Sequence, residues 1–295
     1  MKPIYKIMFV ISMVVFAASV FFLAAYGLNF GVDFKGGSLM ELEFKNERPI
    51  IQDFEKMLSE NFPSLEFNLN PVGDKGVIIR SGEISEDTHQ KITASFKSNF
   101  QGAEFEEKRF DSIGPAVGKE LRNKSFIAIA IVLVAIVAYM TFVFRKLSRT
   151  LSLLAMNVST LVALLNDIII PMGVFALLGH YYNVQISAVF VAAVLTILGY
   201  TVSDKVVIFD RVRENILRGA KGELGEIVHK SVMQTLIRSI NNTLTVILSS
   251  TAIFLFGGES IRYFALALMI GVFLGAYSSI FVASPVFVWL NRKHR

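Results

Sequence analysis

The sequence predicts an α-helical polytopic membrane protein of six transmembrane helices, with a small α+β domain between the first helix and the second. Hydrophobic residues make up 53% of the 295 residues, and the mean hydropathy of +0.55 is too high for a water-soluble chain of this length. The apolar residues gather in runs of about 20, a length that crosses the hydrocarbon core of a bilayer. Lys and Arg gather at alternate ends of these runs, as topology signals do.

The first apolar run, 7–28, contains no charged residue. A signal peptide is the alternative, but the run exceeds the usual apolar core of one and has no clean small-residue cleavage site before Asn29. We therefore expect residues 1–28 to form a retained helix. Five further helices are expected within 124–295, at about 126–144, 151–178, 186–209, 238–256 and 263–290.

Positive charges predict the orientation of these helices. They cluster at alternate helix ends, as Lys2, Lys6, Arg145, Lys146, Arg149, Arg211, Arg213, Arg218, Lys221, Arg292, Lys293 and Arg295. These ends are expected in the cytoplasm, together with both termini, and the inserted domain is expected outside it. The connecting segment 210–237 has apolar residues at roughly helical spacing among its charges, so we expect it to lie along the cytoplasmic interface.

The inserted domain, 29–123, alternates strand-like and helix-like patterns. Strands are expected at 39–44, 66–71, 77–80 and 104–110, and helices at 51–62 and 86–100. This βαββαβ order is that of a ferredoxin-like domain. A role in contacting a partner is more plausible for it than catalysis, because no nucleophile has a base nearby in sequence.

The composition argues against an enzyme, a metal protein and a nucleic-acid-binding protein. The chain has no Cys, its four His lie far apart, and no GxxxxGK[ST] phosphate-binding loop occurs. The net charge of +5 comes from Lys and Arg beside apolar runs rather than on one face of a soluble domain. We expect no catalytic residue, no cofactor, no metal and no nucleic-acid partner.

Three expected helices carry polar side chains at membrane depth, where an ionised group costs on the order of 3 kcal/mol. The stripes comprise Asn157, Thr160 and Asp167 before Pro171, then Thr196, Tyr200, Ser203 and Asp204, then Arg238, Asn242, Thr245 and Ser249. The neutral residues can equally be structural hydrogen-bonding groups between helices, and Arg238 can snorkel to the interface.

Asp204 is the strongest functional candidate, with a second acid at Asp167 and a cation at Arg238 on neighbouring helices. A buried carboxylate whose proton affinity changes when a guanidinium approaches can bind and release a proton as helices move. Lys205 points about 100° away from Asp204 on a helix and is expected to snorkel toward the cytoplasm. In the last helix Gly271, Gly275, Ser279 and Ala283 predict a ridge for close helix packing.

Five short motifs, in the expected order and places, resemble those of the SecF family, membrane subunits that work with SecD beside the bacterial Sec translocon. They are GVDFKGG at 31–37, IGPAVGKEL at 113–121, GYTVSD at 199–204 continued by VIFDRVREN at 207–215, FGG at 256–258 and GAYSSIFVA at 275–283. Their signature positions are Asp33, Gly36, Gly37, Gly114, Pro115, Gly118, Gly199, Asp210, Arg211, Gly257, Gly258 and Gly275.

The resemblance implies a chain of the bacterial inner membrane that pairs with SecD into a twelve-helix unit of the resistance-nodulation-division superfamily. It implies the SecYEG translocon, YajC, YidC, membrane lipid and exported unfolded polypeptide as partners, and the proton-motive force as the energy source. Asp204 would carry the proton, Arg238 would be its cationic partner, and Asp167 would match the acid of the third helix. The polar residues Ser203, Asn166, Asn242 and Thr245 would support them.

The sequence departs from the family pattern at four positions. Asn166 stands where His commonly precedes the acid, Ser203 where Asn is common, Lys35 where Thr is common, and Lys205 where a small or hydroxyl residue is usual. Two other functions stay open: a half-sized proton-coupled exporter of lipid or a small molecule in the same superfamily, and a scaffold protein that transports nothing.

Overall fold

A computed structural model of the chain describes residues 2–100, 104–145 and 151–291. The positive charges at Lys146, Arg149, Arg292, Lys293 and Arg295 therefore lie outside the described residues. The chain divides into two compact units: a helical unit formed by Met1–Asn29 with Phe126–Arg295, and an α/β unit formed by Phe30–Ser125.

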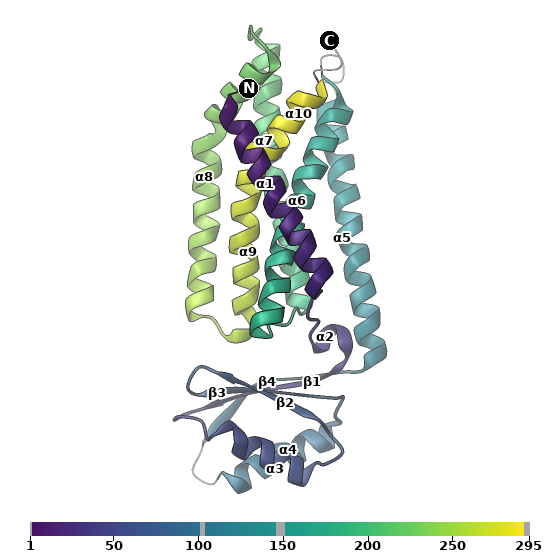
Figure 1. The fold of residues 1–295 in the computed structure, drawn as a ribbon, viewed down its shortest axis with the longest axis vertical. Helices are drawn as coiled ribbons and strands as arrows, with labels where there is room; N and C mark the ends of the chain where they lie inside the picture. Colours follow the sequence, from purple (N-terminus) through teal and green to yellow (C-terminus); the bar gives the residue numbers. More distant parts are fainter. Residues whose placement is uncertain (1, 101–103, 146–150, 292–295) are drawn as a thin grey trace. The chain divides into compact units, whose positions relative to one another are not determined.

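Within the described residues, six helices are long and apolar enough to cross a membrane, as the sequence predicts. They are α1 (Pro3–Tyr26), α5 (Pro115–Phe144), α6 (Leu153–Tyr182), α7 (Ala188–Leu217), α8 (Leu224–Phe256) and a last span, Ile261–Asn291 (Figure 1). The last span contains most of α9 (Glu259–Ser278), a π-helical segment (Ser279–Ala283) and α10 (Ser284–Asn291). The start of α1, the end of α10 and the α7–α8 connection lie at the same end of the helical unit (Figure 1).

Three of these helices form the interior of the helical unit. In their most apolar stretches, 56% of α6, 44% of α7 and 50% of the last span are buried, against 11% of α1, 11% of α5 and 17% of α8. Large apolar side chains such as Val134 and Phe142 on α5 and Leu248 on α8 are exposed. The outer helices therefore present surfaces that suit lipid or the helices of another protein.

Small residues bring the inner helices close together. A Cβ atom added at Gly275 of α9 would lie 2.6 Å from the Cβ of Thr201 on α7, and one at Gly173 of α6 would lie 2.6 Å from the Cα of Ser19 on α1. Both distances are shorter than real carbon contacts, so only glycine permits these approaches. Gly275 is part of the ridge that the sequence predicts for close packing.

Helices α7 and α8 continue past the ends that the apolar runs predict. α7 runs to Leu217 instead of ending near 209, and α8 begins at Leu224 instead of near 238. The predicted interfacial segment 210–237 is thus formed by the ends of two long helices joined by a short turn. Its apolar residues Val212, Val228 and Val232 are each 0% exposed because they pack between helices rather than lying at a surface.

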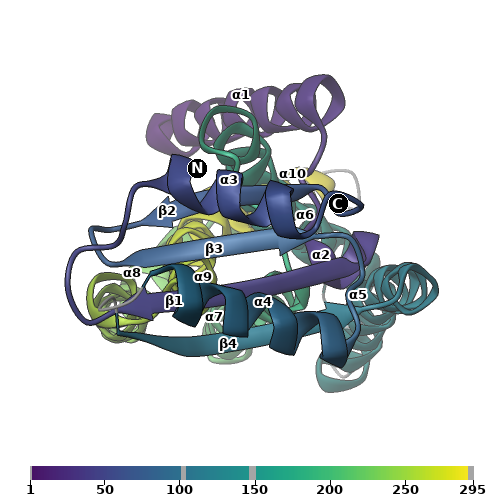
Figure 2. The same ribbon diagram turned by 90° about the horizontal axis from the view of Figure 1, so that it is seen from below.

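The α/β unit follows the order β1 (Gly37–Phe44), α3 (Ile51–Asn61), β2 (Phe67–Val72), β3 (Gly76–Ser81), α4 (Glu86–Asn99) and β4 (Phe105–Ile113), after a short α2 (Val32–Lys35). The four strands form an antiparallel sheet of order β2-β3-β1-β4, in which β2 and β4 are the edges. Figure 2 shows α3 and α4 side by side across one face of this sheet.

Alternation along β1 builds the core of the α/β unit. Met40, Leu42 and Phe44 point to one face and pack with Phe54 of α3 and Phe96 of α4, all at most 3% exposed. The alternation places every second strand residue under the helices, which is why these apolar residues recur at intervals of two. On α4, the Ser85 hydroxyl accepts a hydrogen bond from the Thr88 N–H and caps the helix.

Candidate functional site

Asp204 is buried in the helical unit and bonded to a residue that sequence reasoning missed. Its side chain, on α7, is 6% exposed, and its Oδ2 accepts a hydrogen bond of 2.8 Å from the Ser239 hydroxyl on α8. Ser239 belongs to a series of hydroxyl residues at intervals of four along α8, namely Ser231, Thr235, Ser239 and Thr243, all buried. That spacing follows one face of a helix and could have identified it.

A polar cavity of about 380 Å³ lies close to Asp204, between α7 and α8. Asp210 and Arg211 of α7 line it, with Gln234, Thr235 and Arg238 of α8, two valines of α7 and Val143 of α5. Thr235 is one turn from Ser239, and Arg238 adjoins Ser239 in sequence. Within the described residues, no ion pair joins Arg238 to Asp204. Asp204 is instead bonded to the hydroxyl group of Ser239, and the guanidinium group of the adjacent Arg238 lines the cavity.

Asp167 and Lys205 form an ion pair in the interior. The Lys205 Nζ lies 2.7 Å from Asp167 Oδ2 and 3.2 Å from the Thr201 carbonyl oxygen, and both charged side chains are 0% exposed. The expectation that Lys205 snorkels toward the cytoplasm is therefore wrong. Its long side chain turns inward to α6, because leaving the buried Asp167 carboxylate without an opposite charge would cost more free energy than removing the ammonium group from water.

The neighbouring Asn166 faces a different helix. Its Oδ1 accepts a hydrogen bond of 3.1 Å from the Ser12 hydroxyl on α1, and its Nδ2 has no hydrogen-bond partner within the described residues. Thr160 on the same helix is also buried. Asp167 therefore contacts α7, whereas the adjacent Asn166 joins α6 to α1.

The other predicted polar residues lie on an outer surface of this chain. We call them the polar seam: Ser203 and Asp210 on α7, and Arg238, Asn242 and Thr245 on α8, all exposed. The Thr245 hydroxyl donates to the Asn241 carbonyl oxygen of its own helix at 2.8 Å. The signature residue Gly199, also exposed on α7, has nothing within 4 Å of an added Cβ. The predicted stripe of α8 is thus exposed, whereas the predicted stripe of α7 divides into the exposed Ser203 and the buried Asp204.

Two signature segments pack together in the α/β unit. Gly36 and Gly37 have φ values of +82° and +125°, which L side chains rarely adopt. A Cβ at Gly36 would lie 2.6 Å from the Cα of Pro115, and one at Gly118 would lie 2.9 Å from the Gly36 nitrogen. Asp33, which precedes these glycines in the sequence, is 6% exposed. These residues fix where β1 begins against the start of α5, which is a structural role.

Of the remaining signature residues, the three glycines lie at helix ends, and Asp210 and Arg211 lie within α7. The Gly257 N–H donates to the Ile253 carbonyl oxygen at 2.7 Å and ends α8, and the Gly258 carbonyl oxygen accepts from the first turn of α9. Asp210 accepts from Arg213 at 3.1 Å, and Arg211 donates to Glu214 at 2.6 Å. Gly114 lies in the turn before α5.

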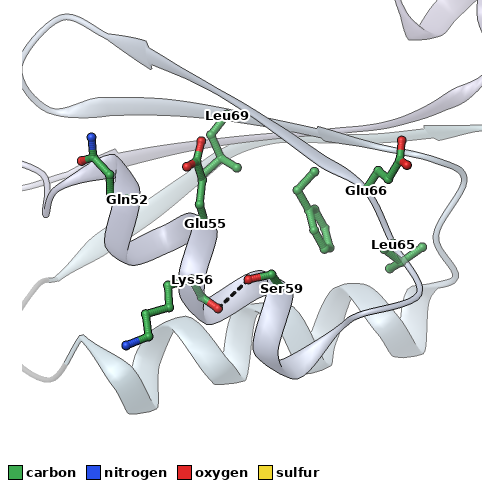
Figure 3. Close-up of a pocket in the computed structure, with 8 residues that line it drawn as sticks. Gln52, Glu55, Lys56, Ser59, Leu65, Glu66 and Leu69 are labelled. Carbon is green, nitrogen blue, oxygen red and sulfur yellow. Dashed lines mark hydrogen bonds between the residues drawn. The ribbon is translucent and has the colours of Figure 1, made fainter.

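The α/β unit also has a groove of about 730 Å³ between α3 and the edge strand β2 (Figure 3). It is lined by Gln52, Glu55, Lys56 and Ser59 of α3 and by Leu65, Glu66, Phe67 and Leu69. The Ser59 hydroxyl donates to the Lys56 carbonyl oxygen at 3.0 Å, a bond within its own helix. Ser59 is therefore held by the backbone and is not arranged as a nucleophile beside a base.

A bundle of membrane-length helices that buries an ion pair and a further carboxyl group, with a small sheet domain inserted after its first helix, defines a class of membrane transport subunit. Residues 91–293 match the family described as "Protein export membrane protein SecD/SecF, C-terminal", and residues 21–47 match the "SecD/SecF GG Motif". The chain belongs to the SecD/SecF family.

Relatives support the SecF role within that family. The chain is 37% identical to the protein translocase subunit SecF of Thermobaculum terrenum, over 96% of this chain and 92% of that protein. It is 33% identical to the protein translocase subunit SecDF of Brucella abortus, over 99% of this chain but 38% of that protein. The crystal structure of SecDF, a translocon-associated membrane protein from Thermus thermophilus, aligns with a TM-score of 0.82 at 28% identity, over 99% of this chain and 38% of that one.

The family is one of translocase subunits, a transport component rather than an enzyme. SecDF relatives contain a match to this chain within a longer protein, which implies a SecD partner for it. It is a multi-pass membrane protein, and in bacteria such subunits belong to the inner membrane.

Proposed function

We propose that this chain joins SecD in the inner membrane and uses the proton-motive force to promote the export of unfolded polypeptide through the SecYEG translocon, with YajC and YidC as accessory partners. Asp204 is the proton-binding group, Ser239 and Arg238 adjust its proton affinity, and Asp167 holds the neighbouring helix. The observation that carries the proposal is a buried carboxyl group, bonded to a hydroxyl and one helical turn from a polar cavity.

The chemistry of this site suits reversible proton binding. A serine hydroxyl can donate to a carboxylate or accept from a carboxylic acid, so Asp204 keeps a hydrogen bond in both forms. Arg238 and Arg211 line the cavity beside it, so the cavity places polar groups next to the carboxyl group. Each proton that crosses a potential of about 100 mV releases roughly 2.3 kcal/mol, so a few protons suffice for a large movement.

The polar seam supports a helical partner. Ser203, Arg238, Asn242 and Thr245 are exposed on helices of membrane length, and polar groups facing lipid are costly. Gly199, in the same face of α7, leaves open space that a closely approaching helix can fill. We infer that the helices of SecD cover the seam, so that the proton route runs between the two subunits.

The α/β unit is proposed to be a ferredoxin-like domain outside the cytoplasm. Its βαββαβ order and its sheet order β2-β3-β1-β4 support the fold assignment. For the orientation, the positively charged connection after α7 lies at the same end of the helical unit as the start of α1 (Figure 1). By the positive-inside rule this end is cytoplasmic, and with it both termini.

The test is secretion of a reporter preprotein in cells depleted of their own SecD and SecF and supplied with this chain and its cognate SecD. Rescue by the native chain and its loss in Asp204→Asn, at equal membrane abundance, are expected. Asp87→Asn, at an exposed position of α4, is the matched control and should rescue fully. Rescue by Asp204→Asn would remove Asp204 from the mechanism. Failure of the native chain in an assembled complex would favour export of a lipid or small molecule instead.

A further inference from the structure

We propose that Lys205 is a built-in counter-ion that keeps Asp167 permanently ionised, so that Asp204 is the single carboxyl group in the interior of this chain that exchanges protons. The inference rests on the proposed function, because it decides which of two buried acids carries the proton. It starts from the ion pair between Lys205 and Asp167, at 2.7 Å and 0% exposure of both side chains.

Among the residues that the structure describes, Lys205 is the one cation that pairs with Asp167. The helices packed against α6 are α1, α7, α9, α10 and, through Asn157, α5. The sequence has no Asp, Glu, Lys or Arg at 7–28, 126–144 or 263–290, and on α6 itself only Asp167 and His180 can carry charge. The charged residues of the remaining neighbour, α7, are Asp204, Lys205, Asp210, Arg211, Arg213 and Glu214.

The partners of the two acids differ in the protonation states that they accept. An ammonium group has three donors and no acceptor, so Lys205 donates to Asp167 Oδ2 but cannot accept from a proton on Asp167, whose buried Oδ1 has no hydrogen-bond partner among the described residues. Ser239 can do both for Asp204. Neutralising Asp167 would leave the Lys205 charge fully buried without an opposite charge, which is strongly unfavourable.

The two acids also differ in their access to water. Asp167 and Lys205 are enclosed on all sides by helices, whereas Asp204 is close to the cavity lined by Asp210, Arg211 and Arg238. The charged groups that act electrostatically on Asp204 are Lys205 of its own helix, Arg238 of α8 and Asp167 of α6. A proton can therefore reach Asp204 along polar groups, while the ion pair joins α6 to α7 as a unit of zero net charge.

The proposal is tested by infrared difference spectroscopy of the full chain, co-purified with its SecD and reconstituted in liposomes, between mildly acidic and mildly alkaline pH. The carbonyl stretch of a protonated carboxyl group reports each acid, and loss of a band on Asp→Asn substitution assigns it. In the native chain we expect a titrating band that is lost in Asp204→Asn and still present in Asp167→Asn. In Lys205→Met we expect an additional band, which is lost again in the double variant Lys205→Met/Asp167→Asn.

A titrating band of the native chain that disappears in Asp167→Asn would overturn the proposal, as would a Lys205→Met chain without a new band. If Lys205→Met fails to fold, the comparison of the native chain with Asp167→Asn still decides the question. A native chain in which neither acid titrates, with no carboxylic-acid band at either pH, would contradict the proposed function while leaving the permanent ionisation of Asp167 intact, so the two failures are distinguishable.

Discussion

Removal of Lys205 should destabilise the helical unit far more than removal of the neutral hydrogen bond between Ser12 of α1 and Asn166 of α6. Lys205→Met replaces the ammonium group with a thioether of similar length and leaves the Asp167 carboxylate 0% exposed without a counter-charge. Breaking one side of a buried pair costs about 3–5 kcal/mol, whereas replacing both sides by neutral groups is often close to neutral. Asp167→Asn alone should cost a similar amount, and the double variant Lys205→Met/Asp167→Asn should recover most of the stability.

The assay is equilibrium unfolding in mixed micelles, followed by fluorescence of the single tryptophan, Trp289, whose ring packs edge-on against Phe9 of α1 at 4.8 Å. The double-mutant cycle of Asp167→Asn and Lys205→Met should show a coupling of at least about 3 kcal/mol in the free energy of unfolding. The matched control is the cycle of Ser12→Ala and Asn166→Ala, because hydrogen bonds between membrane helices average about 0.6 kcal/mol. Additive effects at Asp167 and Lys205, or a coupling no larger than that of the control, would refute the ion-pair reasoning.

Three glycine substitutions test the packing. Gly275→Val should lower the unfolding free energy of the helical unit by at least about 1–3 kcal/mol, because its side chain meets Thr201; unchanged unfolding in mixed micelles would contradict the close approach of α9 to α7. Gly199→Ala should leave the isolated chain as stable or more stable, since alanine is favoured by about 1 kcal/mol in a helix, but should reduce co-purification with SecD; undiminished co-purification would argue against a partner there. Gly36→Ala, at a φ of +82°, should cost the α/β unit about 1–3 kcal/mol in thermal unfolding, whereas Gly82→Ala, in open space without a positive φ, should have little effect.

The sequence predicts the helices of this chain well because lipid-facing and buried helices are both apolar throughout their length. Runs such as 126–144 and 263–290 correspond to α5 and to the last span. The end of α7 and the start of α8 are harder to predict, because beyond the apolar run only one stripe of each helix is apolar and buried. Val228 and Val232 lie on that stripe and stand among charges, a pattern that fits an interfacial helix and a helical hairpin equally well.

The partners of the buried acids were the least predictable part of the site. Spacing along one helix states which residues share a face, but not which neighbouring helix that face meets. Lys205 was rightly separated from Asp204 by their 100° offset, and the same offset directs it to Asp167, 38 positions away in sequence. No periodicity reports such a contact. Ser239, by contrast, lies in a visible series of hydroxyl residues at intervals of four, so its position on the buried face of α8 is predictable from the sequence.

The two polar regions of α7 together explain why this chain needs a second subunit. One face of the helix is closed within the chain, where Lys205 and Thr201 meet α6 and α9. The opposite face carries Gly199 and Ser203 and is open. Asp204 lies buried between these faces, with its hydrogen bond to α8. A partner helix seated against the open face would close the last side of the carboxyl group, so movement of the subunits against each other would change the surroundings of Asp204 directly. In the proposed function, the charge-neutral pair of Asp167 and Lys205 behind it would let α6 and α7 move as one body in that step.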